Sequence, residues 1–382
     1  MQQTALFDLS PAMHVMLMGI AVAIGPLAWL VSRKLEGGAA RRLQALTVLT
    51  LFLTFDLVLF GAFTRLTDSG LGCPDWPGCY GNASPIGASE QIAQAQAQMP
   101  TGPVTHTKAW IEMIHRYLAT GVGVLVLTLL AATLHERKRG AVVSPAWPVA
   151  TLAWVCVQGA FGAFTVTLKL LPAIVTLHLL GGMVLLALLV RQAVAYEHAR
   201  ADRDRTEISP ALRAGLLATL AMIWLQVALG GWVSTNYAVL ACAQFPECQG
   251  SWWPVMNFPQ AFELWRPLGL SSSGAPIDFA ALTAIHFTHR LAAYAVFVAI
   301  ALLASQLVRA GALRRQVNWL IALALLQFAT GLSNVVLGWP LAGAVMHTGG
   351  AAALVGVLTW AACESRAASV QARGASTLEA SA

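Results

Sequence analysis

The stretch AIVTLHLLGGMVLLALLVRQAVA, residues 173–195, decides the fold class of this chain. It is long enough to cross the hydrocarbon core of a bilayer, which takes about 20 helical residues. His178 is its only ionisable residue before Arg191. A second stretch of the same kind, LAGAVMHTGGAAALVGVLTWAA at 341–362, carries His347. Both predict transmembrane helices, because a helix satisfies its own backbone hydrogen bonds in lipid.

The composition of the whole chain supports this prediction. Of its 382 residues, 57% are hydrophobic and only 10% are charged, with a net charge of +6. Soluble domains carry about 25% charged residues, so a soluble, disordered or nucleic-acid-binding protein is excluded. Apolar and polar residues do not alternate as they do in membrane strands. We therefore predict an all-α membrane protein with nine transmembrane helices, at about 14–32, 43–65, 110–134, 146–168, 173–195, 211–235, 280–308, 314–337 and 341–362.

The distribution of basic residues predicts the orientation of these helices. Alternate connections and the C-terminal tail hold 17 of the 23 Lys and Arg residues. Because basic residues stay on the cytoplasmic side, we expect the tail in the cytoplasm and the N-terminus outside. The two long loops, 66–109 and 236–279, then lie on the outer side. The first 13 residues lack Lys and Arg, so we expect the first helix to be retained rather than cleaved.

An internal repeat divides the last eight helices into two sets of four. We expect two parallel-repeat four-helix bundles, at 43–195 and 211–362, preceded by an extra helix and cytoplasmic loop at 1–42 and followed by a tail at 363–382. A shift of 174 positions superposes His115-Arg116 on His289-Arg290. A shift of 169 positions superposes Gln158 on Gln327, Gly162 on Gly331, His178 on His347, Cys73 on Cys242 and Cys79 on Cys248.

Five of the nine histidines lie within predicted spans, where an ionisable side chain usually marks function. Four of them lie roughly 10 Å below the outer helix ends, by the 1.5 Å rise per helical residue. Two histidines at matched depth on facing helices can bind one haem iron as axial ligands. The natural pairs are His115 with His178, and His289 with His347. Histidines that only join helices by hydrogen bonds, and a zinc site, are the weaker alternatives.

The two halves differ next to these histidines. Glu112 lies one turn before His115, whereas His286 occupies the equivalent place before His289. This asymmetry suggests that one half performs chemistry and the other holds a permanent redox group. Arg116 and Arg290 follow the first histidine of each pair, where each could contact a haem propionate or support the ligands. Asp56 is the other carboxylate inside a span, and we expect it to hydrogen-bond between helices.

The remaining motifs lie in the outer loops. Cys73 and Cys79 flank five residues, and Cys242 and Cys248 flank the same number. We expect two disulfides, because both pairs lie on the oxidising side. Each disulfide is a structural staple or, if labile, a redox group. Residues 88–98 predict a short polar helix.

Taken together, these motifs resemble the haem A synthase family, in its cysteine-containing bacterial form. The resemblance rests on GAFTRLTDSGLGCPDWPGC at 61–79, on Glu112-x-x-His115-Arg116, on His286-x-x-His289-Arg290 and on His347. It covers about residues 43–362, and the first helix lies outside the usual eight-helix pattern. The resemblance implies a bacterial inner membrane, with the N-terminus and the two long loops in the periplasm.

The resemblance implies a function for each half. Haem A synthases oxidise the C8 methyl group of haem O to a formyl group, giving haem A for terminal oxidases. By matching motifs, His289 and His347 would bind the cofactor haem b, and His115 and His178 would bracket the substrate haem O. Glu112 would be the catalytic carboxylate. Haem O synthase, terminal oxidase assembly factors, a second copy of the chain and an unidentified electron-transfer partner are the further expected partners.

Two other functions fit the residues alone. One is a dihaem b-type electron-transfer cytochrome, and the other is a haem transporter or chaperone. From the residues, Glu112 either acts as a base or positions water, or it only orients His115 or a haem propionate.

Overall fold

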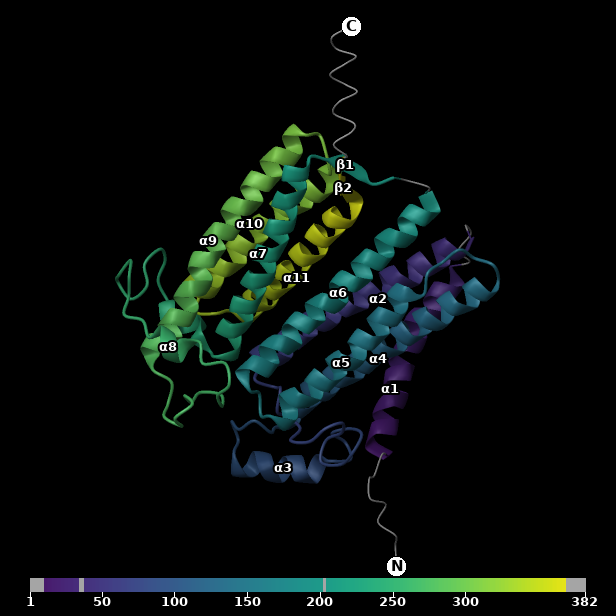
Figure 1. Cartoon of the computed structure of the whole chain (residues 1–382). Helices are drawn as coiled ribbons and strands as arrows, with labels where there is room; N and C mark the ends of the chain where they lie inside the picture. The colour runs from purple at the N-terminus through teal and green to yellow at the C-terminus, as the bar shows by residue number, and fades with distance from the viewer. Residues whose placement is uncertain (1–9, 34–37, 202–203, 369–382) are drawn as a thin grey trace, which may run out of the picture.

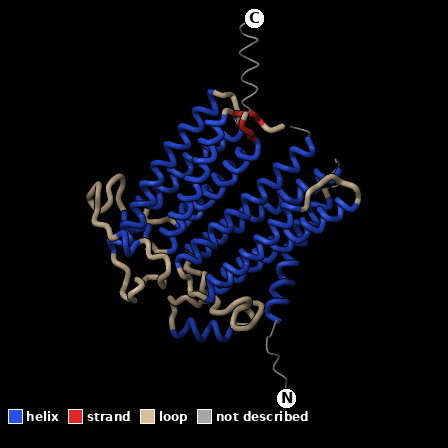
Figure 2. Tube along the Cα trace, in the orientation of Figure 1, coloured by secondary structure: helices blue, strands red, loops and turns tan. Residues whose placement is uncertain are grey.

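The computed structural model describes residues 10–33, 38–201 and 204–368, which are almost wholly helical (Figure 1, Figure 2). In these ranges nine helices are long and apolar enough to cross a membrane. They are α1 (Ser10–Ser32), α2 (Gly38–Leu66), α4 (His106–Lys138), α5 (Ala146–Thr167), α6 (Pro172–Ala201), α7 (Pro210–Thr235), α9 (Phe279–Arg309), α10 (Arg314–Val336) and α11 (Leu341–Glu364). The predicted all-α membrane fold is confirmed, and each predicted span coincides with one of these helices.

Several helices extend beyond the predicted spans because polar residues cap them. The Thr105 hydroxyl accepts a hydrogen bond from the Lys108 amide at 3.2 Å, so α4 begins before its apolar stretch. Ser209 caps α7 in the same way, and Pro210 supplies the first helical residue. Buried Thr47, Thr50 and Thr54 hydroxyls inside α2 donate to carbonyls one turn earlier, so these polar groups are satisfied in lipid.

The helices pack as two groups of four. Helices α2, α4, α5 and α6 contact one another in the first group, and α7, α9, α10 and α11 in the second. Between the groups, α6 packs against α7 and α11, and α2 packs against α11. Figure 1 shows the two groups side by side.

Helix α1 packs on the outside of the first group, against α4. Glycines allow this close approach, since a Cβ on Gly121 would lie 2.9 Å from the Val22 side chain. A Cβ on Gly19 would overlap Thr120 in the same way. Small residues at a helix contact are the usual means of packing helices in a bilayer.

The two long loops lie at one end of the molecule (Figure 1). They hold the short helices α3 (Ser89–Gln98) and α8 (Phe258–Ala261) and a 3-10 helix (Ala238–Cys242), and α3 confirms the predicted polar helix. Strands β1 (Thr206–Ile208) and β2 (Ser365–Ala367) pair in parallel at the opposite end. The two ends of the molecule therefore differ in structure, with long loops at one end and a pair of short strands at the other.

Residues of the loop end join the two halves. The Arg65 guanidinium lies over the Tyr237 ring at 4.1 Å and donates to the Ser234 carbonyl at 2.6 Å. The Tyr237 hydroxyl donates to Asp68 at 2.5 Å, and burial raises the pKa of this hydroxyl, which stays a donor at neutral pH.

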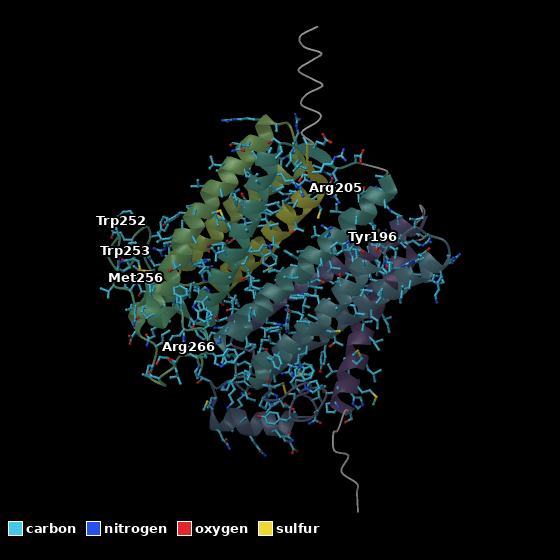
Figure 3. The ribbon with its side chains drawn as sticks, in the orientation of Figure 1. Tyr196, Arg205, Trp252, Trp253, Met256 and Arg266 are labelled. Carbon is cyan, nitrogen blue, oxygen red and sulfur yellow. A yellow bond between two sulfur atoms is a disulfide. The ribbon has the colours of Figure 1, made fainter. Side chains whose placement is uncertain are left out.

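Tryptophans and a buried arginine mark the second loop (Figure 3). Trp252 and Trp253 are exposed there, and the Trp253 ring meets Phe287 edge-on at 5.5 Å. Arg266 is fully buried and donates to the Leu270 carbonyl at 3.0 Å. The Trp253 ring thus ties the loop to α9, and Arg266 joins two parts of the loop itself.

Candidate functional site

The four predicted ligands lie on four different helices and are buried to a similar extent. His115, His178, His289 and His347 belong to α4, α6, α9 and α11, and all four are half-buried. Helices α4 and α6, which carry His115 and His178, both pack against α2 and α5. Helices α9 and α11, which carry His289 and His347, both pack against α7 and α10. Each predicted pair therefore lies within one four-helix group.

A glycine on the neighbouring helix faces each of these imidazoles. A Cβ on Gly162 would lie 3.4 Å from Cε1 of His178. On Gly230 and Gly331 it would lie 3.0 Å and 3.1 Å from Cε1 of His289 and His347, respectively. On Gly61 it would lie 3.1 Å from Nε2 of His115. A Cβ would therefore be tight against the ring at Gly61, Gly230 and Gly331 and in ordinary contact with it at Gly162, so a larger side chain at any of them would displace the ring.

Three of the four histidines are also held by a glutamine. The Gln158 amide contacts Nδ1 of His178 at 3.1 Å and donates to its carbonyl at 2.5 Å. The Gln226 amide does the same for His289, at 3.0 Å and 3.1 Å. The Gln327 amide donates to the His347 carbonyl at 2.9 Å, and the Thr330 hydroxyl meets Nδ1 of His347 at 3.0 Å.

Gln226 and Thr330 are site residues that the sequence analysis did not identify. A signal for Gln226 exists, because Gln158, Gln226 and Gln327 each precede the facing glycine by four residues. That spacing puts the glutamine and the glycine on the same face of the helix. We call this Gln-x-x-x-Gly arrangement the glutamine clamp.

Glu112 lies beside the first disulfide loop. Its side chain is buried, and Oε2 accepts a hydrogen bond from the Cys73 amide at 2.8 Å. The other oxygen forms an ion pair with Arg116. Cys73 and Cys79 form a disulfide, as predicted. The carboxylate therefore links the α4 helix, one turn before His115, to the disulfide loop.

Arg116 and Arg290 hold the two disulfide loops. Arg116 donates to the carbonyls of Asp75 at 2.9 Å, Pro77 at 3.2 Å and Gly78 at 2.5 Å. Arg290 donates to the carbonyls of Pro246 at 3.3 Å, Glu247 at 3.0 Å and Cys242 at 3.1 Å. These contacts give both arginines a supporting role, and a contact with a haem propionate stays a prediction.

The second half repeats the loop but not the carboxylate. Cys242 and Cys248 form the second predicted disulfide. His286 is buried next to Arg290, and its Nδ1 has no hydrogen-bond partner among the described residues. The two halves share a scaffold and differ in the acid–base group beside it.

Other candidates lie outside these pairs. Asp56 is exposed on α2, and the expected hydrogen bond to another helix is not formed with any described residue. His198 pairs with Glu364 at 3.1 Å, far along α6 from His178. Cys156 and Cys363 are free thiols. Within the described ranges, no group of three or more His, Cys, Asp or Glu side chains could hold a metal ion.

The loop-holding arginines allow a stability prediction. We expect Arg290→Met to lower the thermal stability of the purified protein, because three loop carbonyls would lose their donor at roughly 1–3 kcal/mol for a buried group. The measurement is a melting curve in detergent. Arg309→Met, at the exposed end of α9, is the matched control and should melt like the parent chain. Equal melting of both variants would contradict the loop-holding role.

Known proteins resemble this chain over most of its length. The family model described as cytochrome oxidase assembly protein (COX15-CtaA) matches residues 44–359. The Heme A synthase of Shewanella oneidensis is 38% identical over 307 residues, covering 80% of this chain and 92% of the relative. The Heme A synthases of Halalkalibacterium halodurans and of a Bradyrhizobium strain are 24% and 29% identical, each over 80% of this chain and over 91% and 85% of the relative, respectively.

Proposed function

Because the chain belongs to the COX15-CtaA family of cytochrome oxidase assembly proteins, we propose that it is a haem A synthase. It converts haem O to haem A by oxidising the C8 methyl group of the porphyrin to a formyl group. The observation that supports this most is the repeated histidine pair with a carboxylate in one half only. A dihaem cytochrome that only transfers electrons does not need a carboxylate in one half alone.

The residues present fit a haem in each half. An imidazole that binds iron through Nε2 keeps a proton on Nδ1, and this N–H needs an acceptor. The Thr330 hydroxyl is placed to accept from His347, because it already donates to the Leu326 carbonyl. Gln158 and Gln226 each carry a buried Oε1 without a hydrogen-bond partner among the described residues. A half-turn of either amide brings that oxygen to Nδ1 of its histidine, and this hydrogen bond then replaces the one from the amide to the histidine carbonyl.

We assign different roles to the two halves. His289 and His347 bind haem b as the resident cofactor, which supplies one-electron redox chemistry when bound. His115 and His178 bind haem O. Glu112 either takes up a proton from the reacting group or fixes the position of the disulfide loop beside it. Arg116 and Arg290 hold the loops that cover the sites.

The orientation follows from charge. We propose that the end holding α3 and the disulfides faces the periplasm and that β1 and β2 lie on the cytoplasmic side. Arg137, Lys138 and Arg139 end α4 on that side, as the positive-inside rule requires. Disulfides at the opposite end fit an oxidising compartment.

The experiment that tests the function is pigment analysis. The gene is expressed in a cell that makes haem O but lacks its own synthase, and haems are extracted and separated. Appearance of haem A at the expense of haem O supports the proposal. Haem b alone, both in the cells and in the purified protein, would show that the chain is a cytochrome or a carrier instead.

Two glycines on α5 provide a matched test of the haem sites. We expect Gly162→Leu to push the His178 ring aside and to weaken haem binding in the first half by about tenfold or more, since overpacking costs roughly 1–3 kcal/mol. Gly159→Leu is the control, because a Cβ there meets nothing within 4 Å. The measurement is an absorbance titration with haem. Identical titrations would argue against His178 as a ligand.

A further inference from the structure

We propose that His115 is the exchangeable haem ligand of this protein, and that the missing glutamine clamp on α2 makes it so. This inference rests on the proposed function, because it assigns substrate exchange to the half that binds haem O. It concerns one helix position, Leu57, to which no role has been given so far.

The clamp is present on three helices and absent from the fourth. Gln158, Gln226 and Gln327 lie on α5, α7 and α10, four residues before the glycine that faces a histidine. On α2 the facing glycine is Gly61, and the residue four positions earlier is Leu57. Leu57 packs on the apolar core of the first half and has no hydrogen-bonding group.

The His115 ring is accordingly held by apolar contacts. Phe60 stacks on it, with ring centroids 6.3 Å apart and planes 8° from parallel. No hydrogen bond joins the His115 ring to any of the described residues. The other three ligands each receive at least one side-chain hydrogen bond at the ring or at the carbonyl.

The orientation of the His115 ring differs as well. His178, His289 and His347 turn Cε1 toward their facing glycines. His115 instead turns Nε2, the usual iron-binding atom, toward Gly61. The ring of His115 thus differs from the other three in the atom that it turns toward its facing glycine. A ring without a clamp can change this orientation without breaking a hydrogen bond.

Ligand chemistry gives the direction of the effect. A hydrogen bond from Nδ1–H to an acceptor fixes the ring and makes the imidazole a stronger ligand, and its loss commonly costs 10–100-fold in metal affinity. His115 has no such acceptor among the described residues, so it would bind iron more weakly than the other three histidines. A substrate haem must enter and a product haem must leave, whereas a resident cofactor stays. The weaker ligand would thus lie in the half that needs exchange, where His178 would hold the porphyrin during exchange.

The test is to supply the missing clamp. Leu57→Gln places an amide one turn before Gly61, as in the other three helices, and Leu57→Met is the matched control without a hydrogen-bonding amide. Protein loaded with haem O is mixed with excess apomyoglobin, which captures released haem. The parent chain should show a fast and a slow phase of transfer, and His178→Ala should abolish the fast phase. We expect Leu57→Gln to slow the fast phase by about tenfold and Leu57→Met to leave it unchanged.

The reciprocal variant keeps the proposal testable if Leu57→Gln does not fold. Gln226→Leu removes a clamp in the resident half and should speed the slow phase by a similar factor, with the fast phase unchanged. Equal release rates from Leu57→Gln and Leu57→Met, or an unaltered slow phase in Gln226→Leu, would overturn the inference. A parent chain that never binds a second haem would instead refute the proposed substrate site, and the two failures are distinguishable by haem content per chain.

Discussion

Replacing Glu112 with alanine should stop haem A formation while leaving the protein folded and loaded with haem. Its carboxylate is buried, accepts a hydrogen bond from the Cys73 amide and pairs with Arg116, so Glu112→Ala removes the carboxylate that joins these two groups. We expect haem A to fall by about 100-fold or more and haem O to accumulate, the usual scale for a lost acid–base group. The measurement is haem extraction from cells lacking their own synthase. Normal haem A levels would end the assignment.

A second substitution separates the two roles of Glu112. Glu112→Gln keeps a carbonyl oxygen for the Cys73 amide but loses the negative charge. If the side chain only positions the disulfide loop, Glu112→Gln should retain much of the parent activity. If it moves a proton, Glu112→Gln should be as inactive as Glu112→Ala. Glu90→Gln on the exposed first turn of α3 is the control and should behave as the parent.

Much of the fold follows from residue pattern alone. Apolar stretches such as 173–195 predicted the helices, because a chain that crosses lipid must satisfy its own backbone hydrogen bonds and a helix does so within one segment. Helix ends were less predictable, since the cap at Thr105 lies outside the apolar run. The two disulfides could be predicted because the duplicated cysteine spacing needs no tertiary information beyond the side of the membrane.

The contacts inside the site were less accessible to sequence reasoning. Arg116 and Glu112 form hydrogen bonds with backbone groups of the loop. Every residue type has these backbone groups, so the sequence does not show which residues are the partners. Gln226 could have been recognised from its Gln-x-x-x-Gly spacing. Its counterpart on α2 is Leu57, however, so a comparison of the two halves does not single it out. Departures from the repeat, such as Glu112 against His286, indicate function better than its matches, because matches also serve packing.

The haem b proposed for the second half should respond to His347→Met. Nδ1 of His347 meets the Thr330 hydroxyl at 3.0 Å, and its carbonyl accepts a hydrogen bond from the Gln327 amide, so this ring is held in one orientation. Methionine can still offer a sulfur to the iron, but it removes the imidazole and its hydrogen bond. We therefore expect weaker retention of haem b, a shifted absorption spectrum and a higher reduction potential, because His/Met ligation favours the reduced iron.

The matched variant in the other half makes this result specific. His178→Met alters a ligand at the equivalent position of the repeat, also on a helix carrying a glutamine-held histidine. It should reduce haem O binding while leaving the haem b spectrum and potential as in the parent chain. An unchanged spectrum in His347→Met, or equal haem b loss in both variants, would contradict the division into a resident and a substrate half. Because the two sites are built from the same scaffold, only such paired substitutions can show that the halves hold different haems.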